Sequence, residues 1–143
     1  MATVTFFGHR DAPKRIEPAL RLALVDLIEN KNAIFFYVGN QGSFDAMVRR
    51  QLEDLAQTYP ITYRIVLAYM PGKSDASDEH TILPEGLETV PRRFAINHRN
   101  KWILDKADIV VTYVTHPSSG AYKMKETAIE KGKTVINLAL RTE

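Results

Sequence analysis

The sequence predicts one α/β domain: a three-layer Rossmann-like, doubly wound parallel sheet of about five strands in the order 3-2-1-4-5. Predicted strands alternate with predicted helices, the strands are short and almost continuously apolar, and the first two strands stop at Gly8 and Gly39. Alternating strands and helices form a parallel sheet that is covered by helices on both faces. Right-handed crossovers then favour this order, in which the winding reverses between the first and fourth strands.

The first elements show the pattern clearly. Residues 3–7 are β-branched or aromatic, as in a strand. Residues 13–30 carry one apolar stripe at helical spacing, and Pro13 suits the first turn of that helix. The stripe consists of Ile16, Leu20, Ala23, Leu24, Leu27 and Ile28. Residues 34–38 are again apolar and predict the second strand.

The rest of the chain repeats this alternation. We expect Ser43 to cap the next helix, which ends at Pro60. Gly132 is a stop signal for the last helix. The remaining predicted elements are a strand at 63–69, a helix at 91–106, a strand at 109–113, a helix at 119–131 and a strand at 134–138.

One long segment, residues 71–90, interrupts the pattern. It holds the breakers Gly72, Pro84 and Gly86, and its acidic side chains outnumber its single Lys73. Long loops inside a compact domain are usually functional or disordered. Two interpretations stay open: a mobile lid over the sheet edge, or an exposed acidic insertion with no role.

Bulk composition narrows the class of protein. The 143 residues suit a single domain over 1–143, and 45% apolar with 25% charged residues is typical of a soluble globular protein. The absence of cysteine excludes disulfides, thiolate metal ligands and cysteine nucleophiles. A net charge of +2 without a basic block does not indicate a nucleic-acid partner. With no signal-peptide pattern and no long apolar run, we expect a cytoplasmic protein without a membrane partner.

Three polar, glycine-bearing segments follow predicted strands. They are Gly8–Arg10, Gly39–Asp45 and Thr115–Gly120. Because the carboxyl ends of parallel strands meet at one edge, these segments should share the crevice where open α/β sheets bind ligands.

The second segment has the features of an anion site. Gly39 and Gly42 allow close backbone approach, and Asn40 and Ser43 add polar groups where a helix begins. The spacing is neither a Walker A loop nor G-x-G-x-x-G, so a plain strand-to-helix turn is an open alternative. Asp45 can accept hydrogen bonds from ribose hydroxyls or simply complement the helix dipole.

The other two segments add side chains to the same predicted site. Thr115, Ser118, Ser119 and Gly120 repeat the design before another helix, and His116 falls on the same edge. Arg10 can clamp a phosphate or pair with Asp11, and His9 can donate a proton or stack on a base. No carboxylate at ligand spacing accompanies these histidines, so we expect no metal and no other cofactor.

The helix at 91–106 carries a polar stripe. Arg93, Asn97 and Asn100 lie at i, i+4 and i+7, with Arg99 on a neighbouring stripe. Buried asparagine is costly unless it is satisfied, so this face either lines the pocket or is solvated.

Several of these motifs occur together in one family. Phe7–Arg10, Tyr37–Asp45, Arg99–Trp102 and Tyr113–Ala121, followed by Gly132–Leu138, resemble short bacterial and phage proteins of the SLOG superfamily, related to its YpsA-like group. The motifs also include Arg93-Phe94 and Ala107-Asp108. The resemblance spans nearly the whole chain. It implies a Rossmann-like fold, a nucleotide-related ligand and, because relatives are often dimers, a homo-oligomer. Relatives include LOG-type phosphoribohydrolases, the DNA-processing protein DprA and sensors of nucleotide messengers in antiphage defence.

One departure from the family bears on activity. LOG enzymes carry P-G-G-x-G-T-x-x-E with a catalytic glutamate, but counting from Gly120 places Met124 at that position and Glu126 two residues later. We therefore expect a domain that senses or sequesters a nucleotide-derived ligand. The alternatives are a nucleotide N-glycosidase that uses Asp45 or Glu126, and a DprA-like nucleic-acid-binding module, which the charge disfavours.

Overall fold

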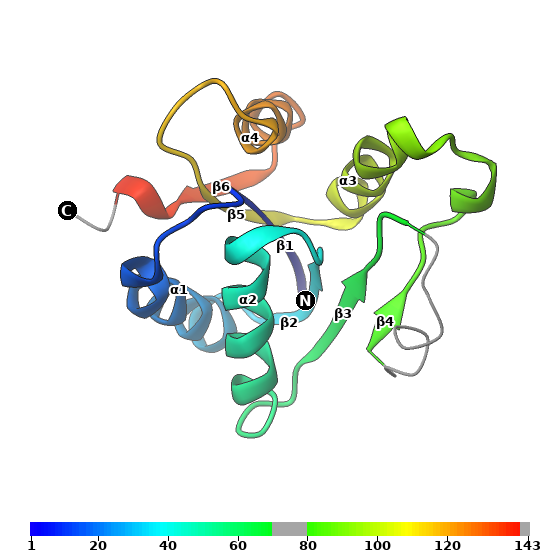
Figure 1. The fold of residues 1–143 in the computed structure, drawn as a ribbon. Helices are drawn as coiled ribbons and strands as arrows, with labels where there is room; N and C mark the ends of the chain where they lie inside the picture. Colours follow the sequence, from blue (N-terminus) through cyan, green and yellow to red (C-terminus); the bar gives the residue numbers. More distant parts are fainter. Residues whose placement is uncertain (70–79, 141–143) are drawn as a thin grey trace.

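The computed structural model describes residues 1–69 and 80–140. Six parallel strands form one sheet in the order β4-β3-β2-β1-β5-β6 (Figure 1). The strands are β1 (Ala2–Gly8), β2 (Ala33–Val38), β3 (Thr62–Val66), β4 (Thr81–Ile82), β5 (Ile109–Tyr113) and β6 (Thr134–Asn137). The α/β class and the relative order of the five predicted strands are confirmed. The predicted number of strands is wrong by one, because β4 adds an edge strand beside β3.

Two helices cover each face of the sheet, and each pair encloses its own apolar core. The helices are α1 (Glu17–Asn30) and α2 (Gly42–Leu55) on one face, and α3 (Ala95–Lys106) and α4 (Gly120–Glu130) on the other (Figure 1). Successive side chains of a strand point to opposite faces. Accordingly Phe6 of β1 packs in the core that includes residues of α1 and α2, whereas Phe7 packs in the core that includes residues of α3 and α4.

Helix boundaries differ from the predictions at several ends. The segments before α1 and α3 begin as 3-10 turns, Lys14–Ile16 and Arg92–Phe94. Helix α2 ends at Leu55 and not at Pro60. The prediction that Ser43 caps α2 is wrong: Gln41 is the N-cap, and the Ser43 hydroxyl donates to Ala12 O at 2.8 Å.

The acidic segment 71–90 is described only from His80 onward, and residues 71–79 lie outside the described residues. The described part contains β4, which pairs in parallel with β3, and the 3-10 turn Leu87–Thr89. Leu87 is buried. A role as a lid stays a prediction.

No helix within residues 1–69 and 80–140 has both the length and the apolar character that crossing a membrane requires.

Candidate functional site

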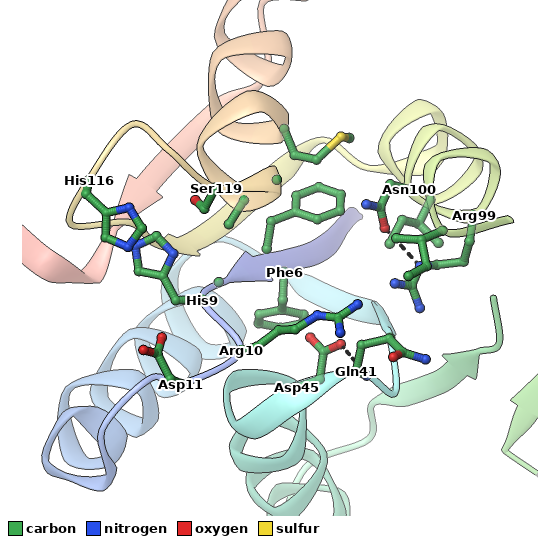
Figure 2. Close-up of a pocket in the computed structure, with 18 residues that line it drawn as sticks. Phe6, His9, Arg10, Asp11, Gln41, Asp45, Arg99, Asn100, His116 and Ser119 are labelled. Carbon is green, nitrogen blue, oxygen red and sulfur yellow. Dashed lines mark hydrogen bonds between the residues drawn. The ribbon is translucent and has the colours of Figure 1, made fainter. Parts of the chain in front are cut away.

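A pocket of about 450 Å³ opens at the carboxyl ends of β1 and β2, between α2 on one side and α3 and α4 on the other (Figure 2). This is the switch point of the sheet, where α/β proteins bind ligands. The pocket draws residues from all three predicted segments and from α3. Its lining comprises Phe6, Phe7, Gly8, His9, Arg10, Asp11, Gly39, Gln41, Asp45, Ile96, Arg99, Asn100, Ile103, His116, Ser119, Gly120, Ala121 and Met124.

The structure brings most of the predicted site residues together. Those that line the pocket are Gly8, His9, Arg10, Gly39, Asp45, Arg99, Asn100, His116, Ser119 and Gly120. Those outside the lining are Asn40, Gly42, Ser43, Arg93, Asn97, Thr115 and Ser118.

The pocket face of α3 is not the predicted stripe. Arg93 and Asn97 are exposed, whereas Ile96, Arg99, Asn100 and Ile103 line the pocket. These four lie at i, i+3, i+4 and i+7, which is one face of a helix. The same spacing in the sequence could have found them, because the apolar Ile96 and Ile103 mark the buried side.

At three of the predicted site glycines, the space that a side chain would need is occupied by other residues of the protein. A Cβ at Gly8 would lie 2.3 Å from the Phe44 ring, and one at Gly42, where φ is +84°, would lie 2.6 Å from Arg10 Cα. A Cβ at Gly39 would lie 2.6 Å from Arg99 Nη1 and 2.7 Å from Asp45 Oδ2. Gly120 differs, since a Cβ added there would meet no heavy atom within 4 Å.

Ser43 does not line the pocket, and it is hydrogen-bonded to the loop after β1. Its N–H donates to Arg10 O at 2.8 Å, and its hydroxyl donates to Ala12 O at 2.8 Å. Both donors are therefore engaged by the loop after β1, and the predicted phosphate-holding role of Gly42 and Ser43 is not supported. The bonds instead hold the loop after β1, with Arg10, next to the first turn of α2.

Asp45 is the most buried carboxylate of the pocket. Asp45 is only 8% exposed, and its Oδ2 accepts the Gln41 N–H at 2.9 Å. Burial raises the pKa of Asp45 above its ordinary value of 3.8, against the opposing effects of the Gln41 hydrogen bond and of the charges of Arg99, Arg49 and Arg10.

Arg99 is a buried cation held in a fixed orientation. The residue is 4% exposed, its Nη1 donates to Val66 O at 3.1 Å, and its Nε donates to Asn100 Oδ1 at 2.9 Å. Burial lowers the pKa of Arg99, the negative charge of Asp45 raises it, and the positive charge of Arg10 lowers it. Two guanidinium groups thus share the surroundings of one carboxylate.

Arg10 is exposed and points into the pocket beside Asp45 (Figure 2). Within the described residues no hydrogen bond or ion pair engages its guanidinium, so the alternative pairing with Asp11 is not formed. Its charge is free to meet a ligand.

His9 fastens two loops together. Its Nε2 accepts the Thr115 N–H at 2.9 Å, so this nitrogen carries no proton and the neutral ring is protonated at Nδ1. Its ring stacks on His116 with centroids 4.1 Å apart, and His116 Nδ1 lies 2.9 Å from Ser118 Oγ. Burial and His116 lower the pKa of His9, while Asp11 raises it less. Thr115 and Ser118 therefore contact the two histidines without lining the pocket.

No group of three or more potential metal-ligating side chains occurs among residues 1–69 and 80–140.

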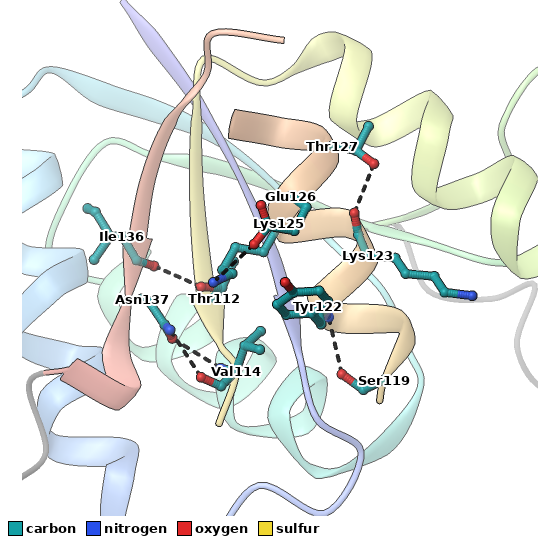
Figure 3. Close-up of polar contacts among 10 residues, drawn as sticks. All are labelled: Thr112, Val114, Ser119, Tyr122, Lys123, Lys125, Glu126, Thr127, Ile136 and Asn137. Atoms are coloured by element: carbon teal, nitrogen blue, oxygen red, sulfur yellow. Dashed lines mark hydrogen bonds and ion pairs between the residues drawn. The ribbon is translucent and has the colours of Figure 1, made fainter. Parts of the chain in front are cut away.

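Side-chain hydrogen bonds fix the segment between β5 and α4 at both of its ends (Figure 3). Ser119 caps the helix by accepting the Tyr122 N–H at 3.1 Å. Asn137 of β6 brackets Val114, accepting its N–H and donating to its carbonyl, each at 3.0 Å. These contacts hold the chain that leaves β5 at the pocket, which Ser119, Gly120 and Ala121 line at the N-terminal end of α4.

Sequence reasoning missed the apolar wall and two polar residues. The missed lining residues are Phe6, Phe7, Asp11, Gln41, Ile96, Ile103, Ala121 and Met124. The apolar ones resemble ordinary core positions, since the same residue types fill both cores. Asp11 and Gln41 lie inside or beside the predicted segments, so adjacency alone could have included them.

The two candidate catalytic carboxylates have different surroundings. Asp45 lines the pocket, but Glu126 does not: its Oε1 lies 3.7 Å from Lys125 Nζ (Figure 3). Met124, at the position of the glutamate in LOG enzymes, lines the pocket with an apolar side chain.

No protein-family model matches the chain, and no curated protein shows significant sequence similarity to it. The resemblance to the SLOG superfamily stays a prediction.

Proposed function

We propose that this protein binds a nucleotide or nucleotide-derived anion in the pocket at the end of β1, and so senses or sequesters it. The observation that carries the proposal is the Arg10 guanidinium, which no residue of 1–69 or 80–140 pairs, next to buried Arg99, both facing one pocket with an apolar wall. Clustered positive charge in a partly enclosed site attracts anions. The start of α4 adds the positive end of a helix dipole on the other side.

The apolar wall suits the nucleobase. Ile96 and Ile103 of α3 and Met124 of α4 lie on the side of the pocket away from α2. A ligand with an anionic end and a flat apolar body matches this division. Most ligand pockets likewise combine a largely apolar lining with a few polar groups that set orientation.

Melting measurements with a ligand panel test the proposal. Nucleoside monophosphates, ADP-ribose isomers and cyclic nucleotides are each added to the purified protein, and ligands that raise Tm are titrated by calorimetry. Charge-assisted hydrogen bonds contribute about 1.5–3 kcal/mol, so Arg10→Gln should weaken binding by about tenfold or more. Arg15→Gln removes another exposed arginine, which lies outside the pocket lining, and should change affinity less than about twofold. Equal effects of the two substitutions, or no Tm shift by any ligand, contradict the proposal.

A nucleotide N-glycosidase is the second candidate, favoured by one observation. Asp45 is a carboxyl with a raised pKa in the pocket, and glycosidic cleavage needs such a group near the sugar. Base release from the same panel, followed by chromatography, tests it. Release that Asp45→Asn abolishes supports the enzyme, and release that both Asp45→Asn and Asp11→Asn leave intact excludes both carboxylates of the pocket. Glu126 lies outside the pocket lining and is not proposed.

A further inference from the structure

Asp45 leaves one carboxylate oxygen without a donor. Oδ2 accepts the Gln41 N–H at 2.9 Å, but among the described residues no hydrogen bond reaches Oδ1. The residue is 8% exposed and lines the pocket, so what reaches Oδ1 must come through the pocket. Oδ1 is not among the fully buried unpartnered atoms of the described residues, so water reaches it through the pocket, and a ligand O–H or N–H can take the place of that water.

Asn100 supplies the complementary donor. Arg99 Nε donates to Asn100 Oδ1, and because a guanidinium has only donors, this bond fixes which end of the amide faces it. The Nδ2 group then keeps two N–H donors directed away from Arg99. Arg99 Nη1 and Asp45 Oδ2 lie 2.6 and 2.7 Å from the same point, the Cβ position of Gly39. The Asp45 carboxylate, an acceptor, and the Asn100 amide, a donor, therefore both lie next to the Arg99 guanidinium. A ligand hydroxyl can both donate and accept a hydrogen bond, so it matches both groups.

The neighbour of Asp45 indicates which part of a nucleotide reaches it. Arg10 lies beside Asp45 (Figure 2), close enough for its charge to act on that carboxylate. When Arg10 holds the phosphate, the group that follows the phosphate is the sugar. The carboxylate is therefore placed for sugar hydroxyls, and the base lies farther along, toward Ile96 and Ile103.

We propose that Asp45 accepts hydrogen bonds from the vicinal hydroxyls of ribose and thereby makes the pocket selective for ribonucleotides over 2′-deoxyribonucleotides. The inference rests on the proposed function, because it assumes that Arg10 faces the phosphate.

Calorimetric titration with matched ligand pairs tests the assignment. The probes are AMP with 2′-deoxy-AMP, GMP with 2′-deoxy-GMP, and ribose 5-phosphate with 2-deoxyribose 5-phosphate. Each ribo form should bind about tenfold or more tightly than its deoxy partner, as expected for a hydrogen bond to a charged group. In Asp45→Asn the amide oxygen can replace Oδ2, which leaves an N–H donor where the acceptor stood. The ribo-to-deoxy ratio should then fall to within about twofold.

A control and three outcomes make the test decisive. Asp54→Asn removes an exposed carboxylate of the same helix, outside the pocket lining, and should keep the wild-type ratio. Equal binding of ribo and deoxy forms by the wild type overturns this inference but leaves the proposed function standing. A preference for GMP over AMP that Asp45→Asn removes, without sugar dependence, also overturns it, since Asp45 then reads a guanine edge. If none of these probes binds, this inference fails, whereas the proposed function fails only if the ADP-ribose isomers and cyclic nucleotides of the wider panel also give no Tm shift. The ribo-to-deoxy affinity ratio is measured within one variant, so it does not depend on how much of that variant is active. If Asp45→Asn does not fold, the wild-type ratio still tests whether the pocket prefers ribonucleotides.

Discussion

The contact between Gly8 and Phe44 predicts a large loss of stability for Gly8→Ala. The new Cβ would lie 2.3 and 2.4 Å from two ring carbons of Phe44 and 2.9 Å from its Cβ. Carbon atoms prefer about 3.5–4.0 Å, so the ring or the end of β1 must move by more than about 1 Å. Phe44 has no exposed surface, and its Cβ is held by helix α2, so it has little room to move. Overpacking of this kind costs about 1–3 kcal/mol, and we expect the upper end, about 3 kcal/mol.

Urea unfolding measures this loss directly. With an m-value of about 2 kcal/mol per molar, a loss of about 3 kcal/mol lowers the midpoint by about 1.5 M while m stays unchanged. Gly120→Ala is the matched control, because no heavy atom lies within 4 Å of its Cβ position and alanine favours a helix more than glycine does. Its midpoint should not fall. A Gly8→Ala midpoint within about 0.3 M of the wild type would refute the packing argument.

Further predictions concern the polar groups around the pocket. Ser43→Ala removes the hydroxyl bond to the loop after β1 and should lower the free energy of unfolding by about 1 kcal/mol in urea; an unchanged midpoint would show that this bond contributes nothing. Nitrogen-15 NMR should find His9 protonated at Nδ1 with a pKa below 6.5, because Nε2 accepts the Thr115 N–H. A ring found protonated at Nε2 would contradict the predicted tautomer. Because the folded pKa of His9 is lowered, protons bind more tightly to the unfolded chain, so the stability that His9 contributes is present above pH 6.5 and is lost as the pH falls through its folded pKa. Arg99→Gln removes the buried charge-assisted hydrogen bond to Val66 O and one of the cations that act on Asp45, while Arg10 and Arg49 remain, and should cost about 1.5–3 kcal/mol near pH 7. That loss should shrink as Asp45 becomes protonated in acid, and a loss that does not depend on pH would argue against charge as its cause.

The fold was largely predictable because its signals are local. Strands such as β5, buried at all five positions, appear in the sequence as continuous apolar runs, and Gly8 at the end of β1 and Gly39 directly after β2 mark where two strands end. Strand β4 was not predictable in this way. It has two residues and exists only through its pairing of Thr81 with Ile65 and of Ile82 with Val66, and so short a segment has no periodicity of its own.

The site was predictable in place but only partly in its residues. Topology alone brings the three polar segments to one edge. Which side chains face inward depends on helix phase and on partners distant in sequence, as with Arg99, whose Nη1 bonds Val66. The glycines show the same limit. Their spacing suggested room for a ligand, but at Gly39 the space is taken by Arg99 and Asp45.

The pocket draws its walls from both halves of the chain: Gly8–Asp11 and Gly39–Asp45 on one side, Ile96–Ile103 and His116–Met124 on the other. A ligand seated there would touch segments that meet only in the assembled domain, so it has no binding site in a chain where either half has come apart. Occupancy would therefore be coupled to cooperative unfolding of the entire domain. At a free concentration about one hundred times Kd, a single-site ligand adds about 2.7 kcal/mol to the stability of every element at once.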